Sequence, residues 1–191
     1  MQDIERMLTE RLSSSGAGLS GMSVGAVADT AGCASDGASP NTGTSTRRVA
    51  ILGCGSTLRG DDAAGTQIAL ELSDLDGRAR AFAGYVAPEN LTGEIKQFAP
   101  DIILLIDAVE LGPEALPGEV RLIDSDDIGG VSFSTHMLPL KIVVNYLTQE
   151  TGAELILLGI QTAGMEFMAE MSPEVKATVD NLTKLLRALL C

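Results

Sequence analysis

The sequence predicts an α/β protein, a three-layer sandwich around a five-stranded, mostly parallel sheet with one antiparallel strand. From residue 47 onward, short apolar runs alternate with amphipathic helical patterns, which is typical of strand–helix–strand units. The run IILLI at 102–106 has no polar residue, as expected of a strand covered on both faces. Residues 112–118 contain only a turn-rich connection, too short for a crossover helix, so the strand after it must pair antiparallel.

The composition supports one folded domain and excludes several classes of protein. Hydrophobic residues make up 45% of the 191 residues and aromatics only 3%, so the core must be aliphatic. A formal net charge of −13 argues against a nucleic-acid-binding surface, which needs clustered Lys and Arg. No apolar stretch is long enough to span a membrane, and no secretory signal is visible. Three cysteines without a CxxC spacing predict neither a disulfide framework nor a zinc site, so a cytoplasmic setting is expected.

The chain divides into an N-terminal segment, residues 1–46, and a domain, residues 47–191. Residues 1–12 have apolar residues at helical spacing, but a helix this short is marginal in water without packing. In residues 13–46, 21 of 34 residues are Gly, Ser or Ala, a composition typical of a flexible linker. We therefore expect an extension that the domain does not need.

Each element of the domain has its own signal. Residues 49–52 are apolar throughout, 63–75 carry one apolar stripe, and the pair Asp76–Gly77 stops that helix. Pro100 closes a helix at 90–98, and Ser172 and Pro173 are good residues for starting a helix at 173–190. The predicted strands are 49–52, 80–86, 102–106, 119–123 and 154–160, and the predicted helices are 63–75, 90–98, 136–151 and 173–190.

Two adjacent carboxylates, Asp61 and Asp62, follow the first strand. In an open α/β sheet this position lies at the carboxyl end of the strand, where ligands bind. One of the two acids is expected to cap the following helix, which leaves the other free to face the crevice.

Asp107 and His136 are the other two candidates. Asp107 stands directly after five aliphatic residues, where a carboxylate is costly unless hydrogen bonds, a cation or solvent satisfy it. His136 is the only histidine and opens a predicted helix, whose dipole favours the neutral, metal-binding imidazole. Two oxygen ligands and one nitrogen ligand suit a divalent metal such as nickel or zinc, held weakly with open positions.

Other motifs are weaker. The dinucleotide fingerprint would need a third glycine where Leu58 stands, and no phosphate-loop lysine is present. Cys54 and His136 could form a nucleophilic pair, but a small residue packed at the end of a strand is the simpler interpretation of Cys54.

Several motifs occur together in a fixed order. They are GxG at 53–55, RGDDxxG at 59–65, IDA at 106–108 and THxxPL at 135–140, with APEN at 87–90, GEVR at 118–121 and LGIQ at 158–161. This set resembles the nickel–iron hydrogenase maturation endopeptidases, in the branch that serves hydrogenase-3-type, formate-hydrogenlyase-like enzymes. Ser56 departs from the family, which usually has Asn there, a residue that tolerates left-handed backbone better.

The resemblance implies a phosphorylase/hydrolase-like α/β fold and a single reaction. That reaction is the removal of the C-terminal extension of a hydrogenase large-subunit precursor after nickel insertion, by aspartic-type or nickel-dependent peptide hydrolysis. Asp62, Asp107 and His136 would be the catalytic and metal-contacting residues. The nickel would arrive with the substrate, with no cofactor resident in the enzyme, and a monomer is expected.

Two alternatives remain open from the residues alone. One is a non-catalytic metal-binding or flavodoxin-like module on the same sheet, and the other is a hydrolase that depends on Cys54. Asp61 and Glu89 could be supporting acids in the protease.

Overall fold

The structure, a computed structural model, describes residues 2–13, 47–123 and 137–191. Its centre is a five-stranded sheet in the order β2-β1-β3-β5-β4. The strands are β1 (Val49–Cys54), β2 (Ala79–Tyr85), β3 (Ile102–Val109), β4 (Val120–Ile123) and β5 (Glu154–Gln161). All neighbours pair in parallel except β4 and β5, which pair antiparallel. The predicted fold class and the antiparallel fourth strand are confirmed.

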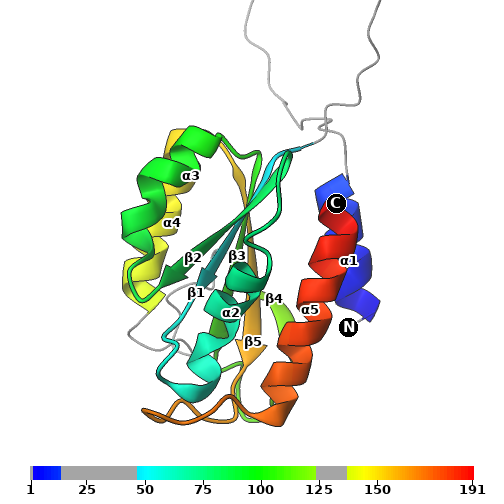
Figure 1. The fold of residues 1–191 in the computed structure, drawn as a ribbon, viewed down its shortest axis with the longest axis vertical. Coiled ribbons are helices and arrows are strands. Elements are labelled where there is room, and N and C mark those ends of the chain that lie inside the picture. The colour runs from blue at the N-terminus through cyan, green and yellow to red at the C-terminus, as the bar shows by residue number, and fades with distance from the viewer. Residues whose placement is uncertain (1, 14–46, 124–136) are drawn as a thin grey trace, which may run out of the picture.

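Helices cover both faces of the sheet and make the three layers visible in Figure 1. One face carries α1 (Gln2–Ser13), α2 (Ala64–Glu71) and α5 (Pro173–Leu190), and the other carries α3 (Thr92–Phe98) and α4 (Met137–Thr151). Alternate residues of β1 and β3 enter the two cores, so that Ile51 and Leu104 face α5 while Leu52 and Leu105 face α3 and α4. Within residues 2–13, 47–123 and 137–191, the structure contains no helix that combines the length and the hydropathy that a membrane span requires.

Several element ends differ from the sequence prediction. The helix expected at 63–75 begins as a 3-10 turn, η1 (Gly60–Ala63), and its α-helical part ends at Glu71. The helix expected at 90–98 likewise begins as the 3-10 turn η2 (Pro88–Leu91), which Pro88 starts. The strand expected to end at Ile106 continues to Val109 because β5 pairs with it through Gln161. The helix at 173–190 has the predicted bounds, with Ser172 as its N-cap.

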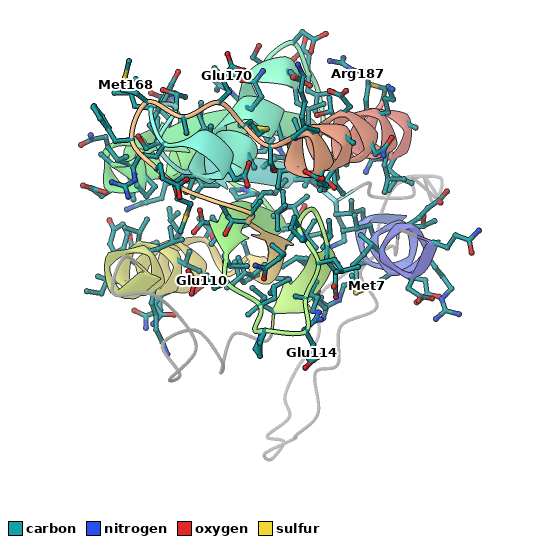
Figure 2. All side chains as sticks on the ribbon, turned by 90° about the horizontal axis from the view of Figure 1, so that it is seen from below. Met7, Glu110, Glu114, Met168, Glu170 and Arg187 are labelled. Atoms are coloured by element: carbon teal, nitrogen blue, oxygen red, sulfur yellow. The ribbon has the colours of Figure 1, made fainter. Side chains whose placement is uncertain are left out.

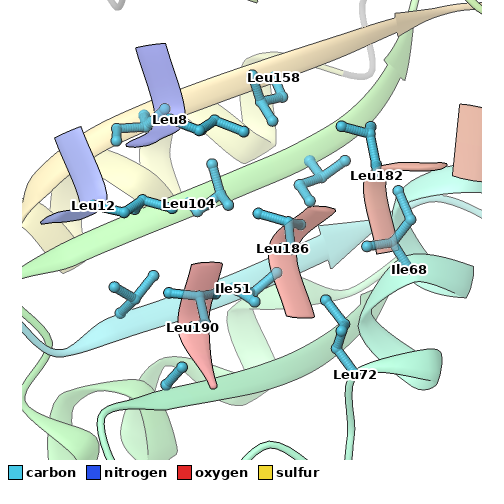
Figure 3. Packing of buried hydrophobic residues seen from close by; sticks show 14 of the residues in the cluster. Leu8, Leu12, Ile51, Ile68, Leu72, Leu104, Leu158, Leu182, Leu186 and Leu190 are labelled. Atoms are coloured by element: carbon cyan, nitrogen blue, oxygen red, sulfur yellow. The ribbon is translucent and has the colours of Figure 1, made fainter. Parts of the chain in front are cut away.

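The N-terminal helix packs into the core. Leu8 and Leu12 of α1 are 0% and 1% exposed, and they lie in the same hydrophobic cluster as Leu158 of β5 and Leu190 of α5 (Figure 3). The helix predicted at residues 1–12 is present, and this burial gives it a packing role that its short length did not suggest. The predicted linker, residues 13–46, lies outside the described residues except for Ser13, which ends α1.

Candidate active site

Parallel strands bring the candidate acids to one edge of the sheet. β1 and β3 are central neighbours with Gly53 opposite Ile106, so the loop after β1 and the end of β3 meet at the carboxyl edge. This is the edge where open α/β sheets place ligands, at the position where the strand order reverses. Asp62 lies in η1 after β1, and Asp107 lies inside β3, opposite Gly159 of β5. Both acids therefore occupy the predicted edge.

Close packing of glycines fixes the loop that carries Asp62. A Cβ added to Gly65 at the start of α2 would lie 2.1 Å from the carbonyl oxygen of Ile106. Gly55 has φ of +116°, which side chains rarely adopt, and a Cβ there would lie 1.7 Å from the carbonyl oxygen of Asp62. Only glycine at these two positions lets α2 and η1 sit directly on the strand ends.

Ser56, the departure from the family motif, does not disturb this loop. The left-handed backbone belongs to Gly55, and Ser56 is not among the residues with positive φ. The backbone N–H of Ser56 donates to Asp62 Oδ2 at 2.8 Å. This contact fixes the carboxylate of Asp62 through a backbone group, which does not depend on the side chain at position 56.

Asp61 is almost completely buried, and its carboxylate is directed at the loop between β5 and α5. Its Oδ2 accepts hydrogen bonds from the backbone N–H of Ala163 (2.7 Å) and Gly164 (3.2 Å) and from Ser172 Oγ (3.0 Å). Its Oδ1 accepts from the backbone N–H of Ser172 at 2.6 Å. This carboxylate fastens η1 to the loop between β5 and α5.

The prediction that one of the two acids caps the following helix is therefore wrong. No side chain caps η1 or α2. Both carboxylate oxygens of Asp61 instead accept hydrogen bonds from residues about a hundred positions away in the chain. The sequence shows Ser172 as a cap of α5, which it is, but carries no signal for its second contact with Asp61. Asp62 does not take part in these contacts, and its carboxylate accepts a hydrogen bond from the N–H of Ser56.

Asp107 is buried, with 9% of its surface exposed, and its Oδ1 accepts a hydrogen bond from the N–H of Ala108 at 3.0 Å. Burial, the larger cause, and the charge of Asp62 together raise the pKa of Asp107 to about 7. The two carboxylates therefore lie close enough for the charge of Asp62 to act on Asp107.

Cys54 lies beside these acids at the end of β1. Burial raises the pKa of its thiol well above the usual value, and the charges of Asp107, Asp62 and Glu89 add to this effect. A nucleophilic cysteine needs a lowered pKa. The environment of Cys54 disfavours the alternative of a thiol-dependent hydrolase and agrees with a packed thiol.

The third candidate ligand, His136, lies outside the described residues, directly before α4. Within residues 2–13, 47–123 and 137–191, no three His, Cys, Asp or Glu side chains gather in a group that could hold a metal ion. The metal-binding set of Asp62, Asp107 and His136 therefore stays a prediction. The structure places two of its members, Asp62 and Asp107, at the carboxyl edge of the sheet.

Comparisons with known proteins agree with this geometry. A family model described as hydrogenase maturation protease matches residues 83–188. The hydrogenase 3 maturation protease of Escherichia coli K12 is 34% identical over 134 residues, which cover 69% of this chain and 84% of that protein.

Solved structures give the same result. The crystal structure of the [NiFe] hydrogenase maturation protease HycI from Thermococcus kodakarensis has a TM-score of 0.68 at 33% identity, covering 75% of this chain and 92% of that chain. The endopeptidase HybD from E. coli has a TM-score of 0.60 at 26% identity, covering 74% and 91%. The chain thus belongs to the hydrogenase maturation protease family, a family of endopeptidases, and the predicted resemblance is confirmed.

Proposed function

We propose that this protein removes the C-terminal extension from the large-subunit precursor of a nickel–iron hydrogenase once nickel has been inserted. One observation carries the proposal: Asp62 of η1 and Asp107 of β3 interact at the carboxyl edge of the sheet in a member of this protease family. Interacting carboxylates in a largely buried position are typical of functional sites.

The two acids fit a divalent cation. Asp62 uses Oδ2 and Asp107 uses Oδ1 for backbone hydrogen bonds, and among the described residues their other carboxylate oxygens accept none. A cation between them would offset both the desolvation and the repulsion that raise the pKa of Asp107. His136 is the proposed third ligand, and a mixed oxygen and nitrogen set is compatible with nickel.

The nickel in this proposal belongs to the precursor. Nickel carried by the precursor supplies the positive charge by which Asp62, Asp107 and His136 recognise a correctly loaded substrate. A precursor without nickel lacks this anchor, so cleavage is coupled to metal insertion. The specificity therefore rests on ligands that the enzyme contributes to a metal it does not keep.

The proposed hydrolysis balances without a cofactor of the enzyme's own. Water adds its oxygen to the carbonyl carbon, the C–N bond breaks, and a proton moves from the water to the leaving amine. The pKa of about 7 at Asp107 belongs to the site without a cation, and contact with nickel would lower it. The proposed role of Asp107 is therefore that of a charged ligand that holds the metal beside the scissile bond.

Incubation of the protein with nickel-loaded and nickel-free precursor, followed by mass spectrometry, tests the proposal. We expect the loaded precursor alone to lose its C-terminal peptide. Asp62→Asn, Asp107→Asn and His136→Ala should each slow this cleavage by about a hundredfold, the scale expected when reacting groups are displaced. Asp180→Asn, on the exposed side of α5, is the matched control and should cut normally. Equal cutting of both precursors would overturn nickel recognition, and no cutting of either would overturn the proposed activity.

A further inference from the structure

Large apolar side chains are exposed around the loop that carries Asp62. Ten large hydrophobic residues of the described chain are exposed, and five of them lie on three segments at the carboxyl edge. We call these five the apolar rim: Leu58, Tyr85, Val86, Phe167 and Met168, with exposed fractions of 43% to 75%. The other five are spread over α2, the loop before β4, β4 itself and α4. Exposed apolar residues that gather in one place are typical of interaction sites.

Backbone hydrogen bonds hold the three segments of the rim together. The N–H of Met168 donates to the carbonyl oxygen of Leu58 at 2.7 Å, and the N–H of Gly55 donates to that of Tyr85 at 2.9 Å. The loop that bears Met168 runs across this end of the molecule, as Figure 2 shows from below. The rim is therefore attached directly to the β1–η1 loop, which leads to Asp62.

Two residues of the rim have a strained backbone. Met168 has φ of +63° and Tyr85 has φ of +49°, and they are two of the three non-glycine residues with positive φ in the described chain. Met168 lies at the second corner of a turn that the N–H of Ala169 closes onto the carbonyl oxygen of Glu166. Glycine would relieve the strain at this corner. An exposed, strained Met does not serve the stability of the fold, and such residues cluster at functional sites.

We propose that the apolar rim is the docking surface for the precursor, and that apolar side chains next to the scissile bond pack against Leu58, Phe167 and Met168. This inference rests on the proposed function and names the surface through which the substrate polypeptide is held. Attachment of the rim to the loop that leads to Asp62 selects this occupant, because a polypeptide cut beside that acid must lie next to this loop. The net charge of −13 disfavours an anionic membrane or a second copy of this acidic chain.

The first test removes the apolar side chains of the rim. The triple variant Leu58→Ser, Phe167→Ser, Met168→Ser should raise the KM for nickel-loaded precursor at least tenfold and change kcat less than threefold. The control variant Leu70→Ser, Ile142→Ser removes exposed apolar side chains from α2 and α4 and should leave both constants within twofold. An unchanged KM in the triple variant, with normal cutting by the wild type, would overturn the docking surface and leave the proposed function intact. A wild type that cuts no loaded precursor would instead overturn the proposed function itself.

Met168→Gly separates docking from folding. This change removes the strain and one apolar side chain together, so we expect a higher melting temperature with weaker precursor binding. A photo-reactive benzoylphenylalanine in place of Phe167 should crosslink to the precursor, and the same group in place of Ile142 should not. A higher melting temperature with unchanged binding, or equal crosslinking at both positions, would overturn the proposal. Sedimentation of the free enzyme gives a further check, because a dimer that the triple variant abolishes would assign the rim to a second copy.

Discussion

The charge of Asp62 adds to burial in raising the pKa of Asp107 to about 7, although 45 positions separate the two residues in the chain. The interaction exists because β1 and β3 are parallel neighbours whose carboxyl ends meet. It makes the candidate site a place where negative charge is held at a cost to stability, as expected where a cation is to be bound.

The cost should be measurable as a pH-dependent stability. The folded protein holds a proton on Asp107 up to about pH 7, whereas the unfolded chain releases it near 3.8, so stability falls as pH rises between these values. Asp107→Asn removes this term. Between pH 5 and pH 8 the free energy of unfolding of the wild type should fall by about 2–3 kcal/mol more than that of the variant, at about 1.4 kcal/mol per pKa unit. Urea denaturation at both pH values measures the difference.

Asp62→Asn is the informative control for that titration. It removes the second cause of the shift but leaves the larger one, burial, in place. We expect a pH slope between those of the wild type and Asp107→Asn. Identical slopes for all three proteins would show that Asp107 is not perturbed.

Asp61 should matter for stability much more than its neighbour. Its two oxygens accept four hydrogen bonds in a buried place, and Asn can offer only one accepting oxygen, with its amide group facing donors. We expect Asp61→Asn to lower the free energy of unfolding by about 2–4 kcal/mol. Asp62 is half-buried, and its carboxylate accepts one hydrogen bond, from the N–H of Ser56. Asp62→Asn should therefore change the free energy of unfolding by less than about 1 kcal/mol at neutral pH. Denaturant unfolding of the two variants compares them directly, and similar losses would contradict the assigned roles.

The sequence predicted the features that local patterns encode. Apolar runs and turn residues gave the order of the elements, the antiparallel β4 and the bounds of α5, because each depends on residues close in the chain. The helix starting at 63 and the strand ending at 106 were misjudged at their ends. There the outcome depends on contacts with distant residues, such as the pairing of β3 with β5.

The site was predictable to a similar extent. Asp62 and Asp107 could be placed on one edge because parallel strands end together. The role of Asp61 could not be found, because its partners Ala163, Gly164 and Ser172 are more than a hundred residues away and three of its four bonds come from backbone groups, which any sequence would supply. The burial of α1 was missed for the same reason.

Gly65 should be irreplaceable. A Cβ there would lie 2.1 Å from the carbonyl oxygen of Ile106 and 2.6 Å from that of Cys54, and neither backbone group can move without shifting a central strand. We expect Gly65→Ala to lower the free energy of unfolding by about 3 kcal/mol or more, beyond the usual range for overpacking. It should also abolish precursor cleavage, because α2 and the loop with Asp62 must move outward.

Gly93 provides the matched control on α3. It has open space around its Cα and a helical backbone, so alanine should be neutral or stabilise the protein by about 0.5–1 kcal/mol. Thermal unfolding of the two variants, with a cleavage assay on each, makes the comparison. Equal stability of Gly65→Ala and the wild type would mean that α2 does not approach the strands as closely as described.

The N-terminal helix should be part of the stable fold. Besides burying Leu8 and Leu12, α1 accepts hydrogen bonds at its last turn, from Arg47 to the carbonyl oxygen of Arg11 and from Arg78 to that of Leu12. We expect Leu8→Ala to lower the free energy of unfolding by about 2–4 kcal/mol, the usual cost of a cavity at a buried leucine. Glu10→Ala, on the exposed side of the same helix, should change it by less than about 0.5 kcal/mol. If denaturant unfolding gave the same value for both variants, α1 would not be docked in solution, and the first 46 residues would be as dispensable as their composition suggests.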